Sequence, residues 1–271
     1  MNQKLSDIYL KSLKEPENFW GEIANDIFWF KKPTKILNKS KSPFYKWFED
    51  GVTNTCYNAL DLHIDNGLGD KIALIYDSPI TGAKSKYTYS QLREKVSKFA
   101  WTLRNQEINK GDRVIIYMPM IPEAVIAMLA CSRIGAIHSV VFGGFASNEL
   151  ANRIEDSKAK ILITASCGFE PGRTIEYKPL VDKAIEISKH KPNKTILYQR
   201  SGHEVKLNGK NEISWDEALN GATEIDCVEM NANELAYILY TSGTTGTPKG
   251  IVRDIGGHIV ALKWTMKNIY N

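Results

Sequence analysis

Residues 113–142 decide the fold class, and they read RVIIYMPMIPEAVIAMLACSRIGAIHSVVF. Two six-residue apolar runs, residues 113–118 and 137–142, predict buried strands. Between them, Pro122 can begin a helix, because the N–H groups of the first helical turn have no partner within the helix and proline lacks an N–H. Gly135 can end that helix. A strand, a helix and a second strand at these lengths predict a right-handed crossover between two parallel strands.

The same alternation continues on both sides of this stretch. We expect further strands over residues 72–76, 160–164, 194–198 and, as the last strand, 235–240, and helices over residues 147–156 and 178–189. Two capping-box patterns, Thr88 with Gln91 and Ser214 with Glu217, predict helix starts. The whole pattern predicts an α/β protein with a mostly parallel sheet and helices on both faces. In such sheets ligands bind beyond the carboxyl ends of the strands.

The composition is that of a folded globular protein. The chain has 271 residues, which corresponds to one large domain or two smaller ones at roughly 100–200 residues per domain. Hydrophobic residues make up 43% and charged residues 24%, which excludes disordered and collagen-like chains. The formal charge of +4 is spread without a dense basic block, so we expect neither nucleic acid nor a membrane as a partner.

The sequence also bears on location and on metal binding. The best candidate for a membrane span, residues 125–131, is interrupted by Ser132 and Arg133 and falls short of the ~20 residues that a span needs. The first residues lack an apolar signal core and contain acidic residues, which a transit peptide avoids. Neither the four cysteines nor the five histidines have metal-site spacing. We therefore expect free thiols in a reducing cytosol, a cytoplasmic protein and no metal site.

Residues 1–65 differ from the rest of the chain because they are rich in aromatic side chains. Phe19, Ile23 and Ile27 recur at helical spacing, whereas Pro33 and Pro43 break the pattern. So short a segment has too little apolar surface to fold alone. We expect it to wrap over a larger body that begins at residue 66, with its aromatic side chains used for packing.

The sequence TSGTTGTPKG, residues 241–250, directly follows the predicted strand 235–240. Its glycines let backbone N–H groups approach an anion, while its hydroxyls and Lys249 add further donors and a positive charge. Together these groups predict a loop that binds a polyphosphate. The spacing differs from that of a Walker A loop, and Ser242 lacks the flanking glycines of a nucleophile elbow.

Residues 240–250 closely resemble the phosphate-binding signature of the acyl-adenylate-forming enzymes, which include acyl-CoA synthetases, luciferases and peptide-synthetase adenylation domains. Residues 47–63 are similar to the N-terminal segment of short-chain acyl-CoA synthetases. The resemblance implies the N-terminal part of the large domain of such an enzyme. It implies an acetyl-CoA synthetase-type segment over residues 1–65 and a truncated AMP-binding domain over residues 66–271. The acyl pocket, the adenine-binding motifs and the C-terminal domain would then lie beyond Asn271.

The resemblance also assigns two groups of site residues. It implies that Thr244 and Lys249 are catalytic, and that both help to bind the phosphates of ATP together with Thr241, Ser242, Gly243, Thr245 and Gly246. It implies that CoA is bound at Gly143, Gly144, Glu170 and Arg173. We expect the loop donors to position phosphates and stabilise charge rather than to transfer protons.

Details of the sequence favour the propionyl-CoA synthetase branch of this family over the acetyl-CoA synthetases. Residues 166–173 read SCGFEPGR, with Glu170 at a position where the acetyl enzymes carry a second arginine. Residues 177–180 and 252–254 also resemble the propionyl type. Glu170 argues against a simple two-arginine clamp on the 3′-phosphate of CoA.

The resemblance implies a two-step ligase that uses ATP, Mg²⁺ and coenzyme A. A short-chain carboxylate, propionate or acetate, would attack the α-phosphorus of ATP to give an acyl-adenylate, from which the CoA thiol displaces AMP. We expect this chain alone to be inactive. Two alternatives stay open. One is a non-catalytic module that binds CoA or phosphate or docks on a partner. The other is a nucleotide phosphotransferase, for which no Walker B carboxylate or kinase motif is evident.

Overall fold

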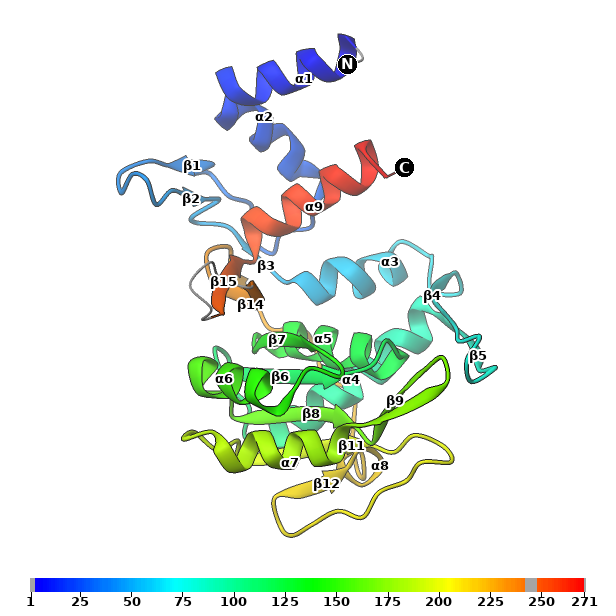
Figure 1. Ribbon diagram of the computed structural model, residues 1–271. Coiled ribbons are helices and arrows are strands. Elements are labelled where there is room, and N and C mark those ends of the chain that lie inside the picture. Colours follow the sequence, from blue (N-terminus) through cyan, green and yellow to red (C-terminus); the bar gives the residue numbers. More distant parts are fainter. Residues whose placement is uncertain (1–2, 242–247, 271) are drawn as a thin grey trace.

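A seven-stranded sheet forms the centre of the computed structural model, which describes residues 3–241 and 248–270 (Figure 1). The strand order is β12-β11-β8-β6-β7-β14-β15, and every neighbouring pair is parallel except β14 with β15. The strands are β6 (Arg113–Met118), β7 (Ile137–Phe142), β8 (Ile161–Ala165), β11 (Lys194–Tyr198), β12 (Glu212–Ser214), β14 (Leu235–Thr241) and β15 (Lys249–Asp254). The predicted α/β class with a mostly parallel sheet is confirmed.

Helices cover both faces of this sheet. They are α4 (Tyr89–Asn105), α5 (Pro122–Ile134), α6 (Ser147–Ser157), α7 (Tyr177–Ile187) and the one-turn α8 (Trp215–Ala218). The crossover through α5 runs from β6 to β7, and the crossover through α6 runs back past β6 to β8. Right-handed crossovers in opposite directions place their helices on opposite faces. Because α4 packs beside α5 and α7 beside α6, the inner strands are buried from both sides.

The helix ends follow the sequence signals: α4 begins after Thr88, α5 begins at Pro122 and ends at Gly135, and α8 begins after Ser214. Thr88 Oγ1 accepts a bond from the Gln91 N–H at 3.2 Å, and the Gln91 side chain accepts one from the Thr88 N–H at 3.0 Å, so the first capping box is confirmed. Gly135 ends α5 with a φ of 72°, a conformation that favours glycine. The second box is only half formed, because Ser214 caps the Glu217 N–H whereas the Glu217 side chain is exposed to water.

The sheet continues one strand beyond the sequence prediction, which placed the last strand at residues 235–240. β15 pairs antiparallel with β14, from Thr241 opposite Lys249 to Leu235 opposite Asp254. β15 is exposed along nearly its whole length, so it has no alternating apolar pattern that could reveal it. After β15 the chain forms α9 (Gly256–Asn268).

Besides one antiparallel pair within the N-terminal segment, two short antiparallel hairpins lie outside the main sheet in the described part of the chain. One joins β4 (Ile72–Asp77) to β5 (Lys84–Thr88) and precedes α4. The other joins β9 (Cys167–Glu170) to β10 (Arg173–Glu176) and connects β8 to α7. The second hairpin therefore lies at the carboxyl end of β8, where the predicted CoA-binding residues fall.

The N-terminal segment divides between two packing environments. Its elements are α1 (Gln3–Lys14), α2 (Pro16–Ile23), β1 (Leu37–Asn38), β2 (Lys46–Trp47), β3 (Val52–Thr53), a π-helical turn (Tyr57–Asp61) and α3 (Leu62–Asp65). The π-helical turn and α3 pack on α4. The earlier residues instead form a second core with α9 that includes Trp29, Phe48 and Val260. Figure 1 shows α1, α2 and α9 grouped together on one side of the sheet.

The packing role that we expected for the N-terminal aromatic side chains holds for only part of them. Phe19, Trp29 and Phe48 are buried, whereas Phe44 and Tyr45 are exposed. β3 also pairs with β13 (Met230–Asn231), which ties this segment to the chain just before β14. Within the described part of the chain, no helix has the length and apolar character needed to cross a membrane.

Candidate functional site

The predicted ligand-binding segments meet at the carboxyl edge of the main sheet. Gly143 follows β7, the β9–β10 hairpin follows β8, and Thr241 ends β14. Because these strands are parallel, the segments that follow them emerge at the same edge of the sheet, in the order of the strands. The structure thus brings the predicted CoA residues, which follow β7 and β8, to the same edge as Thr241 at the end of β14.

Gly143 lies in a turn that leaves no room for a side chain. A Cβ atom at this position would overlap the Tyr177 hydroxyl and would approach the Met118 carbonyl oxygen to 2.9 Å. Gly144 has a φ of 97°, and its N–H donates to the Tyr117 hydroxyl at 3.1 Å. Tyr117 in turn donates to the Phe145 carbonyl at 2.8 Å. The turn after β7 is therefore fixed by two buried tyrosines from β6 and α7.

Glu170 and Arg173 bind each other across the tip of the β9–β10 hairpin. The Arg173 Nε and Nη2 atoms lie 2.7 Å and 2.6 Å from Glu170 Oε2. Gly172 allows this tight turn with a φ of 76°. The Arg173 side chain is 69% exposed, and the Glu170 carboxylate partly neutralises its positive charge.

Two neighbouring cavities separate this hairpin from β6 and the β4–β5 hairpin. The first, of about 340 Å³, is lined by Gly143, Glu170 and Tyr177 among others. The second, of about 470 Å³, is lined by Tyr87, Glu123 and Tyr198 among others. Both cavities share four lining residues: Tyr76, Ile121, Phe169 and Arg200. They form a groove along the carboxyl edge that begins at the predicted CoA residues.

The phosphate segment connects two antiparallel strands, not a strand and a helix. Thr241 and Lys249 are direct partners in the register of β14 and β15, so both ends of the segment are held side by side. Lys249 is the first residue of β15 and is exposed. Five predicted residues of this segment lie outside the described residues: Ser242, Gly243, Thr244, Thr245 and Gly246.

Arg153 of α6 joins the two groups of segments, and sequence reasoning missed it. Its guanidinium lies 5.2 Å from the Phe145 ring, after β7, and 5.4 Å from the Tyr240 ring, on β14. Its Nη1 also donates to the Glu149 carboxylate at 2.7 Å. Tyr240 is further held by a 2.6 Å bond from its hydroxyl to Asp156. No sequence signal distinguishes Arg153 from a solvated arginine on a helix, because its burial depends on partners distant in the chain.

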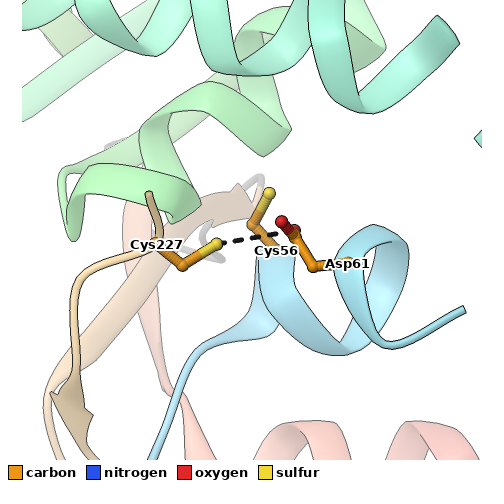
Figure 2. Close-up of side chains that lie close together, drawn as sticks. All are labelled: Cys56, Asp61 and Cys227. Atoms are coloured by element: carbon orange, nitrogen blue, oxygen red, sulfur yellow. Dashed lines mark hydrogen bonds between the residues drawn. The ribbon is translucent and has the colours of Figure 1, made fainter. Parts of the chain in front are cut away.

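A second arginine, Arg133 of α5, is buried in a cluster with Asp61, Cys56 and Cys227. Its two Nη atoms donate to the Asp61 carboxylate at 2.8 Å and 3.0 Å, and Nη1 lies 3.6 Å from Cys56 Sγ. Figure 2 shows the two sulfur atoms near the carboxylate, with Cys227 donating to Asp61 at 3.7 Å. The hydrogen bond with Cys56, followed by burial, raises the pKa of the Cys227 thiol.

The ligand-type atoms of Cys56, Asp61 and Cys227 lie within 4.8 Å of one another, which is close enough for a shared metal ion. The guanidinium, however, already binds both carboxylate oxygens and would repel a cation. The cluster instead anchors the N-terminal segment to the body, because Asp61 comes from the former and Arg133 from the latter.

Comparisons with known proteins agree with this geometry. Residues 63–270 match the family of AMP-binding enzymes, and residues 5–59 match the acetyl-coenzyme A synthetase N-terminus. The human protein "acyl-CoA synthetase short-chain family member 3, mitochondrial" is 52% identical over 97% of this chain and 38% of its own length. The acetyl-coenzyme A synthetase of Methylocella silvestris is 43% identical over 99% of this chain and 42% of its own length.

A solved structure shows the same fold. The acetoacetyl-CoA synthetase from Streptomyces lividans superposes with a TM-score of 0.84 and 25% identity, over 94% of this chain and 39% of that one. The chain therefore belongs to the AMP-binding enzyme family. It spans about two fifths of the length of the curated relatives it matches.

The predicted cytoplasmic location is wrong. Relatives from Homo sapiens, Bos taurus and Dictyostelium discoideum, at 52%, 53% and 46% identity, are named as mitochondrial proteins. The prediction failed because it used features that do not report on the compartment. Unpaired cysteines are compatible with any reducing compartment, and the fold is the same wherever the protein is delivered.

Proposed function

We propose that this chain supplies the phosphate-binding and CoA-binding edge of an AMP-forming ligase that joins a short-chain carboxylate to coenzyme A. One observation carries the proposal: the segments after β7, β8 and β14 lie at one edge of one parallel sheet, in a chain of the AMP-binding enzyme family. A single edge of this kind can hold the two substrates of consecutive steps close to the same acyl group.

In the first step, a carboxylate oxygen attacks the α-phosphorus of ATP, and the bond to pyrophosphate breaks. The role of Thr241 and Lys249 is to hold the phosphate oxygens and stabilise their charge, because a hydroxyl and an ammonium donate hydrogen bonds to anions. The Asp156 carboxylate beside this end of β14 accepts a hydrogen bond from the Tyr240 hydroxyl. The ion would be bound mainly through the phosphates, where it neutralises their charge.

In the second step, the CoA sulfur attacks the acyl carbon and AMP leaves. The turn at Gly143 and Gly144 and the β9–β10 hairpin would hold CoA. The position of Gly143 supports this role, because it lines the cavity of about 340 Å³ together with Glu170 of the hairpin.

We further propose propionate as the preferred acid, with acetate also used. The sequence SCGFEPGR and residues 252–254 support this choice, together with the short-chain synthetase relatives. One extra methylene in an apolar pocket changes selectivity by only roughly 10- to 200-fold, so both acids should react. Steady-state kcat/KM for acetate, propionate and butyrate tests this choice in the chimera described next.

A chimera tests the function directly. This chain replaces the matching 38% of the human relative, and carboxylate-dependent exchange of pyrophosphate into ATP reports the first step. We expect the chimera to catalyse exchange and the 271-residue chain alone to be inactive. A soluble chimera that binds CoA but shows no exchange would favour the non-catalytic binding module instead.

Lys249→Ala in the chimera should slow exchange by about 10²–10³, the usual effect of removing one charged donor from a developing anion. Thioester formation from supplied acyl-adenylate should change far less, because pyrophosphate has already left. Lys249→Arg is the matched control, since it keeps the charge. Equal losses in both half-reactions would contradict the role proposed for Lys249.

A further inference from the structure

We propose that Cys56 and Cys227 form a reversible disulfide, a modification site that fastens the N-terminal segment to the body under oxidising conditions. Both cysteines are free thiols in the structure. Their sulfur atoms lie within 4.8 Å of each other, beside Asp61 (Figure 2). The inference is independent of the proposed function, because it concerns the anchor of the N-terminal segment and not a substrate.

The backbone brings the two cysteines opposite each other. β3 and β13 pair antiparallel, with Thr53 opposite Met230. Continuing this register by three residues in each strand places Cys56 opposite Cys227. A disulfide needs such an arrangement, because the two Cα atoms must lie about 4.4–6.8 Å apart. The chain around Cys56 becomes helical, so a side chain and not the strand ladder must keep the two segments together there.

Asn54 is that side chain. It is fully buried, and its amide nitrogen donates to the Val228 carbonyl at 2.8 Å and to the Ser132 carbonyl at 3.0 Å. Its amide oxygen accepts the Cys56 N–H at 2.8 Å. These bonds fix the backbone next to both cysteines. The remaining approach of the sulfur atoms, to a bond of about 2.05 Å, is left to rotation of the two side chains.

The two sulfur atoms differ in access and in their neighbours. Of the four cysteines, all of which lie within the described residues, three are buried and Cys227 is partly exposed. Its thiol donates to the Asp61 carboxylate at 3.7 Å. The Cys56 sulfur is buried and accepts a bond from Arg133 Nη1 at 3.6 Å. An oxidant therefore reaches Cys227 first, and a positive charge lies beside the sulfur that closes the disulfide.

The oxidant that we propose is a small disulfide such as glutathione disulfide. The Cys227 sulfur attacks one of its sulfur atoms, the S–S bond breaks, and the first glutathione leaves with the Cys227 proton. The Cys56 sulfur then attacks the Cys227 sulfur of this mixed disulfide, and the second glutathione leaves with the Cys56 proton. Two protein thiols are thus oxidised to one disulfide while one glutathione disulfide is reduced to two thiols.

The raised pKa of Cys227 keeps its sulfur protonated at neutral pH, whereas exchange requires a thiolate. We therefore expect slow oxidation, so that the pair responds to lasting oxidising conditions. The bond closes a loop of roughly 170 residues, and long loops constrain the unfolded chain most strongly. It would hold the N-terminal segment on the body even when the Asp61–Arg133 pair opens.

Overnight equilibration of the 271-residue chain with glutathione disulfide at mildly alkaline pH tests the pairing. Remaining thiols are then alkylated, and peptide mass mapping identifies the disulfides. We expect a Cys56–Cys227 disulfide in most molecules, with Cys131 and Cys167 alkylated. The same oxidation in guanidinium chloride is the reference. An unfolded chain favours short loops, so Cys131–Cys167 should there exceed Cys56–Cys227.

Thermal unfolding tests the fastening. The oxidised chain should unfold about 5–10 °C higher than the reduced chain, and a dithiol reductant should reverse this shift. Cys227→Ser should unfold at one temperature under both conditions. Cys131→Ala is the matched control, since it removes a buried thiol outside the pair and should keep the shift.

Three results would overturn the proposal. The first is recovery of Cys56 and Cys227 as free thiols, or the same mixture of disulfides with and without guanidinium chloride. The second is a reaction that stops at a glutathione adduct on Cys227, which would mean that Cys56 does not reach it. The third is an oxidised chain with the mapped bond that unfolds at or below the temperature of the reduced chain, which would exclude the fastening role. Pyrophosphate exchange by the chimera remains the separate test of the proposed function.

Discussion

The inner strands and the β14–β15 hairpin are parts of one sheet with very different surroundings. All five residues of β8 and five of the six in β6 are buried, whereas five of the six residues in β15 are exposed. The segments proposed to bind CoA follow inner strands, whereas the segment proposed to bind phosphate connects the two strands at the edge. Stability within a protein follows such differences in burial, so the hairpin should open locally at a lower free energy than the body.

Few side chains attach this hairpin to its surroundings. On one side Tyr240 bonds to Asp156 and packs against Arg153. On the other side the Tyr237 hydroxyl and His258 of α9 share a hydrogen bond of 2.8 Å. α9 belongs to the second core with the N-terminal segment, so the hairpin lies between two bodies and connects them. Movement of one body against the other would be transmitted to the phosphate segment.

The largest effect is expected where the N-terminal segment is anchored to the body. Asp61→Asn leaves the Arg133 guanidinium, 1% exposed, without its carboxylate. Breaking a buried pair by removing one partner costs about 3–5 kcal/mol, because the remaining charge stays desolvated. Urea unfolding should show this loss in the free energy of unfolding.

Asp77→Asn is the control for this substitution, because its pair with Lys84 is exposed on both sides. Exposed pairs contribute about 0–1 kcal/mol. If both variants lose the same small amount, Arg133 finds other partners, and the N-terminal segment is not anchored by this pair.

The second prediction tests the boundary between β7 and β14, where His138 is buried opposite Tyr237. Burial lowers the pKa of this imidazole from 6.5 to about 4. Between these two pH values, His138 is therefore protonated in the unfolded chain and neutral in the native protein. Stability is fully present above pH 6.5 and falls as the pH decreases toward 4.

The expected loss from His138 alone is about 2–3 kcal/mol between pH 7 and pH 4.5. His138→Leu removes this titration and keeps the site apolar, so its unfolding free energy should fall less over the same interval. The other acid-sensitive groups cancel in the difference between the two proteins. If the unfolding free energies of the unmodified protein and of His138→Leu fall equally with pH, His138 is hydrated in the native state.

The sequence predicted the inner strands and their helices because each carries a local signal. The apolar runs of β6 and β7, Pro122 and Gly135 each act within a few residues of the element that they define. β15 has no such signal, since an exposed edge strand is defined by pairing with a distant partner. Long-range partners also account for Arg133 and Arg153, which are buried by residues far away in the chain and resemble surface arginines in the sequence.

For the site, the residue types predicted an anion-binding segment and a turn that requires glycine, but not their surroundings. The Glu170–Arg173 pair could be suspected from their spacing of three residues. The groove beside Arg200 could not, because its walls come from β4, β6, β9 and β11. A site built from several crossovers becomes visible only when the strand order is known.

The third prediction tests the rigid side of the comparison, at the turn after β7. Gly143→Ala places a methyl group against the Tyr177 hydroxyl and the Met118 carbonyl. Overpacking of this kind costs about 2 kcal/mol. Tyr177→Phe removes the hydroxyl, so the double variant should be more stable than the sum of the two single effects predicts, by about 1 kcal/mol.

Gly172→Ala is the control, because a Cβ there meets no atom within 4 Å and only the φ of 76° is strained. It should cost about 1 kcal/mol and should show no coupling to Tyr177→Phe. Coupling at Gly172 equal to that at Gly143 would mean that Tyr177 acts through the whole hairpin and not through contact with the turn.

The smallest effect is expected at the hairpin, and it distinguishes local from global opening. Tyr240→Phe removes the 2.6 Å bond to Asp156 but keeps the ring against Arg153. An exposed hydrogen bond to a carboxylate contributes about 1 kcal/mol, which corresponds to a roughly fivefold change in an equilibrium constant. Because the hairpin lies at the edge, this loss should appear as faster hydrogen exchange at the β15 amides, while the β6 amides keep their rates. Asp156→Asn still offers an acceptor to Tyr240 and should accelerate exchange in β15 less. Equal acceleration in β15 and β6 would show that the edge opens only when the whole sheet unfolds, so that the phosphate segment is held as firmly as the CoA turn.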